Sequence, residues 1–337
     1  MSGATISSPS TGFVQRHNSE TALDQSSMTS RSASMAPMRR NRKILALRGS
    51  EQTQSMTIKN SLWSRILVWL IFIAAFVYFV VPALWLFVAA TKNAGELYTT
   101  GGFEFAHFRL WENISNLFAY RGGIFARWLL NSVIYSGFGS VVTALVSAMC
   151  GYALYVYEFR GKKIILGALM ASLLIPATVI AQPVYLLLIQ LGLGNTMAGV
   201  LLPSFVYPFG VMLCYITAQA SVPREIIEAA RIDGAGEFHI FFRISLPMMM
   251  TGLATVFLFA FMQSWNSYMM PLMVLDDPNL YPVTVGLVDW RNQSSSVASL
   301  GTLTIIGAFI SIIPLILIFL ATQKYWKAGL AAGGVKM

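Results

Sequence analysis

Residues 223–247 read PREIIEAARIDGAGEFHIFFRISLP, and this is the most informative stretch of the 337-residue chain. Its first residue, Pro223, suits the first turn of a helix because that position needs no backbone N–H. Gly234 comes eleven residues later, and glycine readily adopts the left-handed conformation that ends a helix. The stretch therefore predicts two short helices joined by a sharp turn at Gly234, with the second helix starting near Glu237.

Six apolar runs surround this stretch, four before it and two after it. Each is close to the roughly 20 residues that a helix needs to cross the hydrocarbon core of a bilayer. Lipid offers no hydrogen-bond partner to the backbone, so the runs are expected to be helical. We place these spans near residues 66–89, 128–156, 164–190, 197–220, 250–275 and 302–323, which leaves 221–249 as a polar loop.

The composition agrees with an all-α integral membrane protein. Apolar residues make up 56% of the chain and charged residues only 11%, whereas soluble domains carry about 25% charged residues. Residues 1–60 differ, because they are polar, rich in Ser and Arg, and without apolar periodicity. We expect them to form a disordered cytoplasmic tail, and residues 61–337 to form one six-span domain.

The basic residues orient the predicted spans. Of the 23 Lys and Arg residues, 18 fall in residues 1–65 and in segments 157–163, 221–249 and 324–337, against five in segments 90–127, 191–196 and 276–301. Cytoplasmic loops carry the excess of basic residues, so both termini are expected in the cytoplasm. The net charge of +9 is explained by this distribution, and a nucleic-acid partner is not expected.

The sequence carries no recognisable catalytic or metal-binding pattern. The three His residues lie in separate regions and the two Cys residues lie inside apolar runs, so no metal site is expected. Gly161-Lys162 is the nearest approach to a phosphate-binding loop, but Val156 stands where its first glycine should be. The chain is therefore expected to be a non-catalytic subunit that hydrolyses no ATP by itself.

The loop carries a longer pattern. Glu228-Ala229-Ala230 is followed at fixed spacing by Gly234, Ile244 and Leu246-Pro247. This pattern resembles the EAA loop of ABC importer permeases of the type I fold, and its position between the fourth and fifth spans agrees. Trp265-Asn266, Pro271-Leu272 and the closing Gly329-Leu330 resemble the carbohydrate-uptake branch, close to the second membrane subunit of maltose-type transporters.

The resemblance implies a role for the loop and a set of partners. In this family the loop forms a coupling helix that docks in a cleft of a cytoplasmic ATPase subunit, which uses ATP and Mg while the permease binds no cofactor. The residues that the resemblance assigns to ATPase coupling are Glu228, Ala229, Ala230, Asp233, Gly234, Ile244, Leu246 and Pro247. The implied assembly contains a second homologous permease, two ATPase subunits and an extracellular solute-binding protein, in the lipid of a bacterial cell membrane.

The implied function is import of a sugar, of the oligosaccharide class, by alternating access. Gln182, Gln263, Trp265 and Asn266 are candidates for the substrate path, since amides bind hydroxyl groups and aromatic rings stack on sugars. Each also has a packing interpretation, as interhelical hydrogen bonds or an interfacial Trp. The alternative function is a self-contained secondary transporter or channel, which would purify alone, but the chain shows no internal repeat of interrupted helices.

Overall fold

The computed structural model describes residues 62–334, with side chains up to residue 325, so the predicted tail of residues 1–60 lies outside the described part. The chain divides into two units, residues 1–68 and 69–337. The described residues of the first unit begin the long helix α2 (Leu62–Ala90). Over the described range every regular element is helical and no strand occurs, which confirms the all-α prediction.

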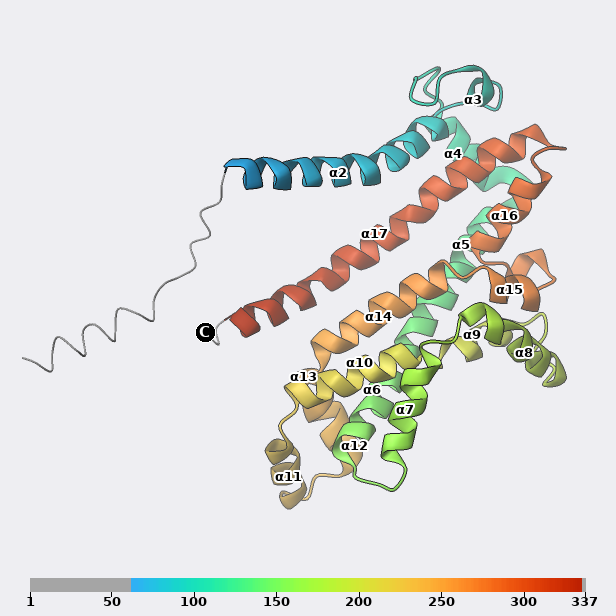
Figure 1. Ribbon diagram of the computed structural model, residues 1–337. Helices are drawn as coiled ribbons and strands as arrows, with labels where there is room; N and C mark the ends of the chain where they lie inside the picture. The colour runs from blue at the N-terminus through green and yellow to red at the C-terminus, as the bar shows by residue number, and fades with distance from the viewer. Residues whose placement is uncertain (1–61, 335–337) are drawn as a thin grey trace, which may run out of the picture. The chain divides into compact units, whose positions relative to one another are not determined.

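The second unit continues α2 and then holds a series of mostly short helices (Figure 1). Up to the stretch quoted above these are α3 (Glu96–Thr99), α4 (Leu110–Ala119), α5 (Ile124–Val133), α6 (Gly139–Val156), α7 (Lys162–Ser172), α8 (Ala177–Gln190), α9 (Met197–Ser204) and α10 (Pro208–Ser221). From that stretch onward they are α11 (Arg224–Ile232), α12 (Glu237–His239), α13 (Leu246–Met248), α14 (Met250–Trp265), α15 (Met269–Val274), α16 (Val283–Gln293) and α17 (Ala298–Gly334).

Short segments of other helix types join some of these helices. The π-helix Ile134–Phe138 connects α5 to α6, and a second π-helix, Ile240–Ser245, connects α12 to α13. Two 3₁₀ turns, Tyr120–Gly122 and Pro278–Leu280, precede α5 and α16. Because the first π-helix continues the helical path, Ile124–Val156 forms one apolar helix of 33 residues.

Four described helices are long and apolar enough to cross a membrane, namely Leu62–Ala90, Ile124–Val156, Met197–Ser221 and Ala298–Tyr325. Two bent pairs raise the number to six if each counts as one span. Lys162–Ser172 and Ala177–Gln190 meet at 108° around Pro176, and Glu237–Met248 meets Met250–Trp265 at 82°. The third apolar run is thus sharply bent at Pro176, because proline disfavours the helical conformation of the residue before it.

The expected fifth span, residues 250–275, is wrong at its end. The helix stops at Trp265, and α15 begins as a separate helix at Met269. Asn266 turns its side chain back to the carbonyl of Met262 at 2.8 Å, and the carbonyl of Ser267 accepts a hydrogen bond from the hydroxyl of Thr284 at 2.7 Å. Pro271 has no N–H to offer the carbonyl of Ser267, so the hydroxyl of Thr284 takes that place, and apolar composition alone overestimated the helix length.

The helix α6 lies at the centre of the second unit, with α10 and α14 packed along it (Figure 1). Gly151 allows this close approach, because a Cβ atom there would come within 2.6 Å of the backbone nitrogen of Tyr215. Buried residues of α6, α10, α11 and α14 form one apolar core, which contains Ala148, Tyr152, Cys214, Ile227 and Val256. A helix that is packed from two sides in this way can carry a displacement along its length.

Candidate functional site

We call residues 223–239, which contain α11, the turn at Gly234 and α12, the knob. Gly234 has φ +80°, the left-handed conformation that its position in the sequence predicts. The N–H of Gly234 bonds to the carbonyl of Arg231 and the N–H of Ala235 to that of Ala230, each at 3.0 Å. These two bonds make the Schellman motif that closes a helix and reverses the chain. The geometry of the knob therefore follows from one glycine.

The two faces of α11 have different surroundings. Ile227 and Ala230 are buried, with exposed fractions of 2% and 8%, and they pack into the core with α6 and α10. Glu228 and Ala229 are exposed, and Ile232 is 86% exposed. The small side chain of Ala230 brings α11 close to the core of its own chain.

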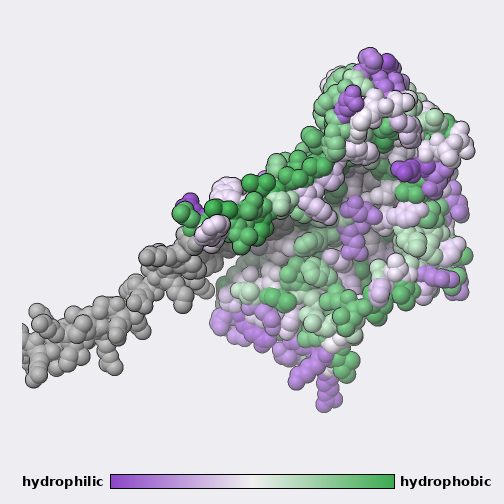
Figure 2. Space-filling view, turned by 45° about the horizontal axis from the view of Figure 1, so that its top comes forward, coloured by the Kyte–Doolittle hydropathy of each residue, from purple (hydrophilic) through white to green (hydrophobic). Residues whose placement is uncertain are grey.

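The remaining coupling residues lie at different depths. Asp233 and Gly234 are exposed at the turn, where a Cβ atom added to Gly234 would meet nothing within 4 Å. Ile244 and Leu246 are partly buried and pack against the core, beyond the knob itself. The exposed Pro247 opens the short helix α13. The motif thus supplies an exposed turn and a packed connection to α14. Figure 2 shows hydrophilic residues along the lower edge of the view, where α11 lies in Figure 1.

A polar cluster joins the C-terminal side of the knob to the residue that follows α6. Arg231 donates two hydrogen bonds to the carboxylate of Glu237, at 2.7 and 3.1 Å, and the hydroxyl of Tyr157 donates a third at 2.6 Å. The guanidinium of Arg231 also lies 5.9 Å from the centroid of the Tyr157 ring. These donors lower the pKa of Glu237, chiefly through Arg231. The bond to Glu237 raises the pKa of Tyr157.

A second polar cluster holds the start of the knob. Arg224 donates to the carbonyl of Tyr155 at 3.2 Å and to the carboxylate of Glu158 at 3.1 Å, and its guanidinium lies 5.3 Å from the centroid of the Tyr155 ring. The hydroxyl of Tyr155 donates to the carbonyl of Val222 at 2.9 Å. Lys162 bonds to the same carboxylate at 3.0 Å, so Lys162 and then Arg224 lower the pKa of Glu158.

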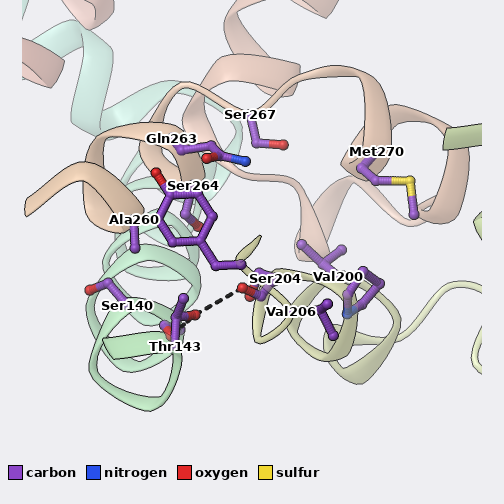
Figure 3. A pocket seen from close by; sticks show the side chains of 13 residues that line it. Ser140, Thr143, Val200, Ser204, Val206, Ala260, Gln263, Ser264, Ser267 and Met270 are labelled. Carbon is purple, nitrogen blue, oxygen red and sulfur yellow. Dashed lines mark hydrogen bonds between the residues drawn. The ribbon is translucent and has the colours of Figure 1, made fainter. Parts of the chain in front are cut away.

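A cavity of about 160 Å³ lies among α6, α9 and the α14–α15 connection. Figure 3 shows hydroxyl groups of α6 and α9 on one side and Gln263, Ser264 and Ser267 on another. The hydroxyl of Thr143 donates to the carbonyl of Ser204 at 2.8 Å, which joins α6 to α9 at the cavity wall. The lining polar side chains can donate and accept hydrogen bonds, as recognition of a polyol requires.

The four candidate residues of the substrate path do not gather at this cavity. Gln263 lines it, whereas Gln182 is exposed on α8 and is not among its lining residues. Trp265 is 4% exposed, with its ring stacked on Phe261 at 5.6 Å, and this favours the packing interpretation. The side chain of Asn266 caps its own helix through Met262.

Sequence reasoning missed the hydroxyl groups of α6, although a signal was present. Ser136 of the preceding π-helix and Ser140, Thr143 and Ser147 of α6 recur at steps of four, three and four, which places them on one helix face. All four are buried, and two of them line the cavity. The clusters at Tyr155 and Tyr157 had no comparable signal, because aromatic and charged residues are common at the ends of membrane helices.

Comparison with known families gives a match over residues 140–330 to a family described as "Binding-protein-dependent transport system inner membrane component". The matched range contains α6, the knob and most of α17. It therefore includes both the cavity wall and the two polar clusters described above.

Several curated proteins are similar over most of their length. The arabinooligosaccharides transport system permease protein AraQ of Halalkalibacterium halodurans is 34% identical over 279 residues, which cover 81% of this chain and 98% of that protein. The diacetylchitobiose uptake system permease protein NgcG of Streptomyces coelicolor is 29% identical over 256 residues, covering 75% of this chain and 83% of that protein. The lactose transport system permease protein LacG of Rhizobium radiobacter is 29% identical over 255 residues, covering 76% of this chain and 90% of that protein.

A solved structure shares the fold. It comes from a bacterial ABC transporter involved in the import of the acidic polysaccharide alginate, with a TM-score of 0.65 and 19% sequence identity. The match covers 87% of this chain and 99% of that chain. The described helices thus have the fold of an ABC importer permease.

Proposed function

The chain belongs to the family of binding-protein-dependent transport system inner membrane components, and from this premise we propose that it is a permease subunit of an ATP-driven importer of sugars, with oligosaccharides as the substrate class. The named substrates of similar proteins support the class, since they include arabinooligosaccharides, diacetylchitobiose and lactose. The family description refers to a transport system with a binding protein, which argues against the alternative of a self-contained transporter or channel.

The observation that carries the proposal is the exposed face of the knob. The turn at Gly234 presents Glu228, Ala229 and Asp233 to solvent, while the opposite face of α11 packs into the core. An ATPase subunit that receives this face in a cleft moves the knob when two such subunits close on ATP and Mg. Because α10 precedes the knob and α13 and α14 follow it, the helices around the cavity then change position, as in a rigid-body transition between two states.

The proposed assembly follows from the same division of labour. This chain supplies half of a transmembrane pathway, a second homologous permease supplies the other half, and an extracellular solute-binding protein delivers the sugar. The two ATPase subunits stand on the cytoplasmic side, so the knob and both termini belong there. Gln263 and the hydroxyl groups of the cavity are the proposed contacts to sugar on this subunit's side.

The test compares two glycines on either side of one alanine. Gly234→Asp places a side chain at φ +80°, which costs roughly 1 kcal/mol, and puts a charge on the proposed contact. Gly236→Asp adds the same charge at an exposed position with φ −71°, where the backbone is unstrained. Neither added Cβ meets another atom of this chain, so both variants are expected to insert and fold.

We expect Gly234→Asp to lower uptake at least tenfold and to weaken retention of the ATPase during purification, with Gly236→Asp close to wild type. Uptake of arabinooligosaccharide, diacetylchitobiose and lactose is measured at matched membrane levels, together with the proteins that copurify. Equal uptake by the two variants would show that the turn at Gly234 is not part of the coupling contact. A wild-type chain that purifies without an ATPase would contradict the proposed function itself.

A further inference from the structure

We propose that the end of α6 and the turn after it form a clamp on the knob, so that a displacement of the knob reaches the cavity through α6 directly. The clamp consists of Tyr155, Tyr157, Glu158, Arg224, Arg231 and Glu237. The inference rests on the proposed function, because it concerns how the coupling contact transmits its motion. It assigns positioning roles to side chains that lie outside the EAA pattern.

The clamp contacts both ends of α11. At the N-terminal end, Arg224 bridges the carbonyl of Tyr155 and the carboxylate of Glu158. At the C-terminal end, Arg231 and Tyr157 meet on the carboxylate of Glu237. Contacts at two points fix the direction of a short helix as well as its distance, whereas contact at one point would let it swing. The knob is therefore oriented by α6 and not only by its covalent neighbours.

The helix α6 connects the clamp to the cavity. Its C-terminal residue is Val156, next to the clamp, and its first turns carry Ser140 and Thr143 at the cavity wall. The bond from Thr143 to the carbonyl of Ser204 continues this connection to α9. Along the chain itself, the knob reaches the same cavity only through α10 or through α13 and α14. The clamp thus adds a polar route, beside the apolar packing of Ile227 and Ala230 against α6, that ends at the same wall.

The clamp contacts are weak enough to open and form again in each transport cycle. The side chains of Arg231 and Glu237 are 38% and 44% exposed, and those of Arg224 and Glu158 are 50% and 68% exposed. Exposed ion pairs add little to global stability. The burial of Ile227 and Ala230 holds α11 to the core, so losing the clamp is expected to leave the fold intact while changing the orientation of the knob.

The test removes single clamp contacts with nearly isosteric changes. Tyr157→Phe deletes the hydroxyl but keeps the ring beside Arg231, and Glu237→Gln deletes the charge but keeps the shape. The double variant shows whether both changes act through one contact. Glu112→Gln is the matched control, because it neutralises an exposed carboxylate that lies 3.5 Å from Arg109 and far along the chain from the knob.

The first measurement is amide hydrogen exchange of α11 in the purified full-length chain. We expect at least threefold faster exchange in Tyr157→Phe and in Glu237→Gln, and a less than additive change in the double variant. The Glu112→Gln variant should match wild type. This measurement needs no partner, so it decides whether the clamp holds the knob even if the proposed function fails. Unchanged exchange in both clamp variants would overturn the clamp.

The second measurement follows α6 in the assembled transporter. Arg160 is exposed in the turn after α6, so an Arg160→Cys, Cys150→Ser chain labelled with a fluorescent maleimide reports the surroundings of the end of α6. We expect addition of ATP and Mg to change its fluorescence when the clamp is intact. The change should fall at least threefold in the clamp variants while the ATPase still copurifies. An undiminished change would overturn transmission through α6, whereas a wild type without any ATPase would instead contradict the proposed function.

Discussion

The two ends of the helix Ile124–Val156 are fastened to their neighbours in different ways. Near its start, Trp128 is 2% exposed, packs against Trp290 at 4.6 Å and donates from Nε1 to the carbonyl of Pro278 at 2.7 Å. Asn131 and Tyr135 donate to further carbonyls of the same turn. Near its end, beside the apolar packing of Ile227 and Ala230, Tyr157 and Glu158 contact the knob through an exposed hydrogen bond and an exposed ion pair.

The difference separates a fixed end from an adjustable one. A buried donor that loses its carbonyl leaves a polar group without water or protein as partner, which costs about 1–3 kcal/mol. An exposed ion pair that opens exchanges its partner for water and costs about 0–1 kcal/mol. The Trp128 end therefore acts as the support of the helix, and the knob end is the one that can change its contacts during transport.

The largest expected effect lies at the fixed end. Trp128→Ala removes a buried ring. Gly286 packs so closely against this ring that a Cβ atom added to Gly286 would lie 2.2 Å from the ring. Loss of such a side chain costs about 3–5 kcal/mol. We expect a lower midpoint in denaturant unfolding of the detergent-solubilised chain and less folded protein in the membrane. A stability within 1 kcal/mol of wild type, on the order of an exposed substitution, would contradict the description of this end as the support.

A smaller effect is expected from Asn131→Ala at the same end. Asn131 is 3% exposed and donates to the carbonyls of Asn279 and Tyr281, at 2.8 and 3.0 Å. We expect a loss of about 1–3 kcal/mol in the free energy of unfolding, measured by the same denaturant titration. Tyr135→Phe is the comparison, because it removes only one bond, to Leu280. A larger loss in Tyr135→Phe would reverse the ranking.

At the adjustable end, Glu237→Gln is expected to change the free energy of unfolding by less than about 1 kcal/mol. The same variant should speed exchange in α11, so local and global measurements are expected to diverge. For the fixed end they should agree, because loss of Trp128 affects the whole core. A loss in the free energy of unfolding of Glu237→Gln as large as that of Asn131→Ala would contradict the distinction between the two ends.

The smallest effect is a dependence of the clamp on pH. The pKa of Glu237 lies below its ordinary value of 4.5 in the folded chain. Its stabilising contribution is therefore complete above pH 4.5 and is lost as the pH falls through the lower, folded-state value. Glu158 has a lowered pKa as well and acts in the same direction. We expect protection of α11, corrected for intrinsic exchange rates, to fall in acid, and to fall less in Glu237→Gln.

Much of the architecture could be predicted from the sequence because it depends on local or repeated features. Apolar runs require helices in lipid whatever their neighbours are, and the turn of the knob depends on one glycine at φ +80°. The EAA pattern identified the family through fixed spacing. The end of the fifth span is settled less locally, because the carbonyl of Ser267, which Pro271 leaves without a helical donor, accepts its hydrogen bond from Thr284, seventeen residues away.

The sequence by itself determined the all-α membrane class, the position of the knob and the residue at its turn, since each follows from composition or from neighbours within a few residues. Only the tertiary structure decided which face of α11 is available. It buried Ala230 against the chain's own core and left Ala229 exposed. It also brought Tyr157 to Glu237, 80 residues apart. Such pairings depend on how α6, α10 and α14 pack, and no local pattern records the contacts between helices that are distant in the sequence.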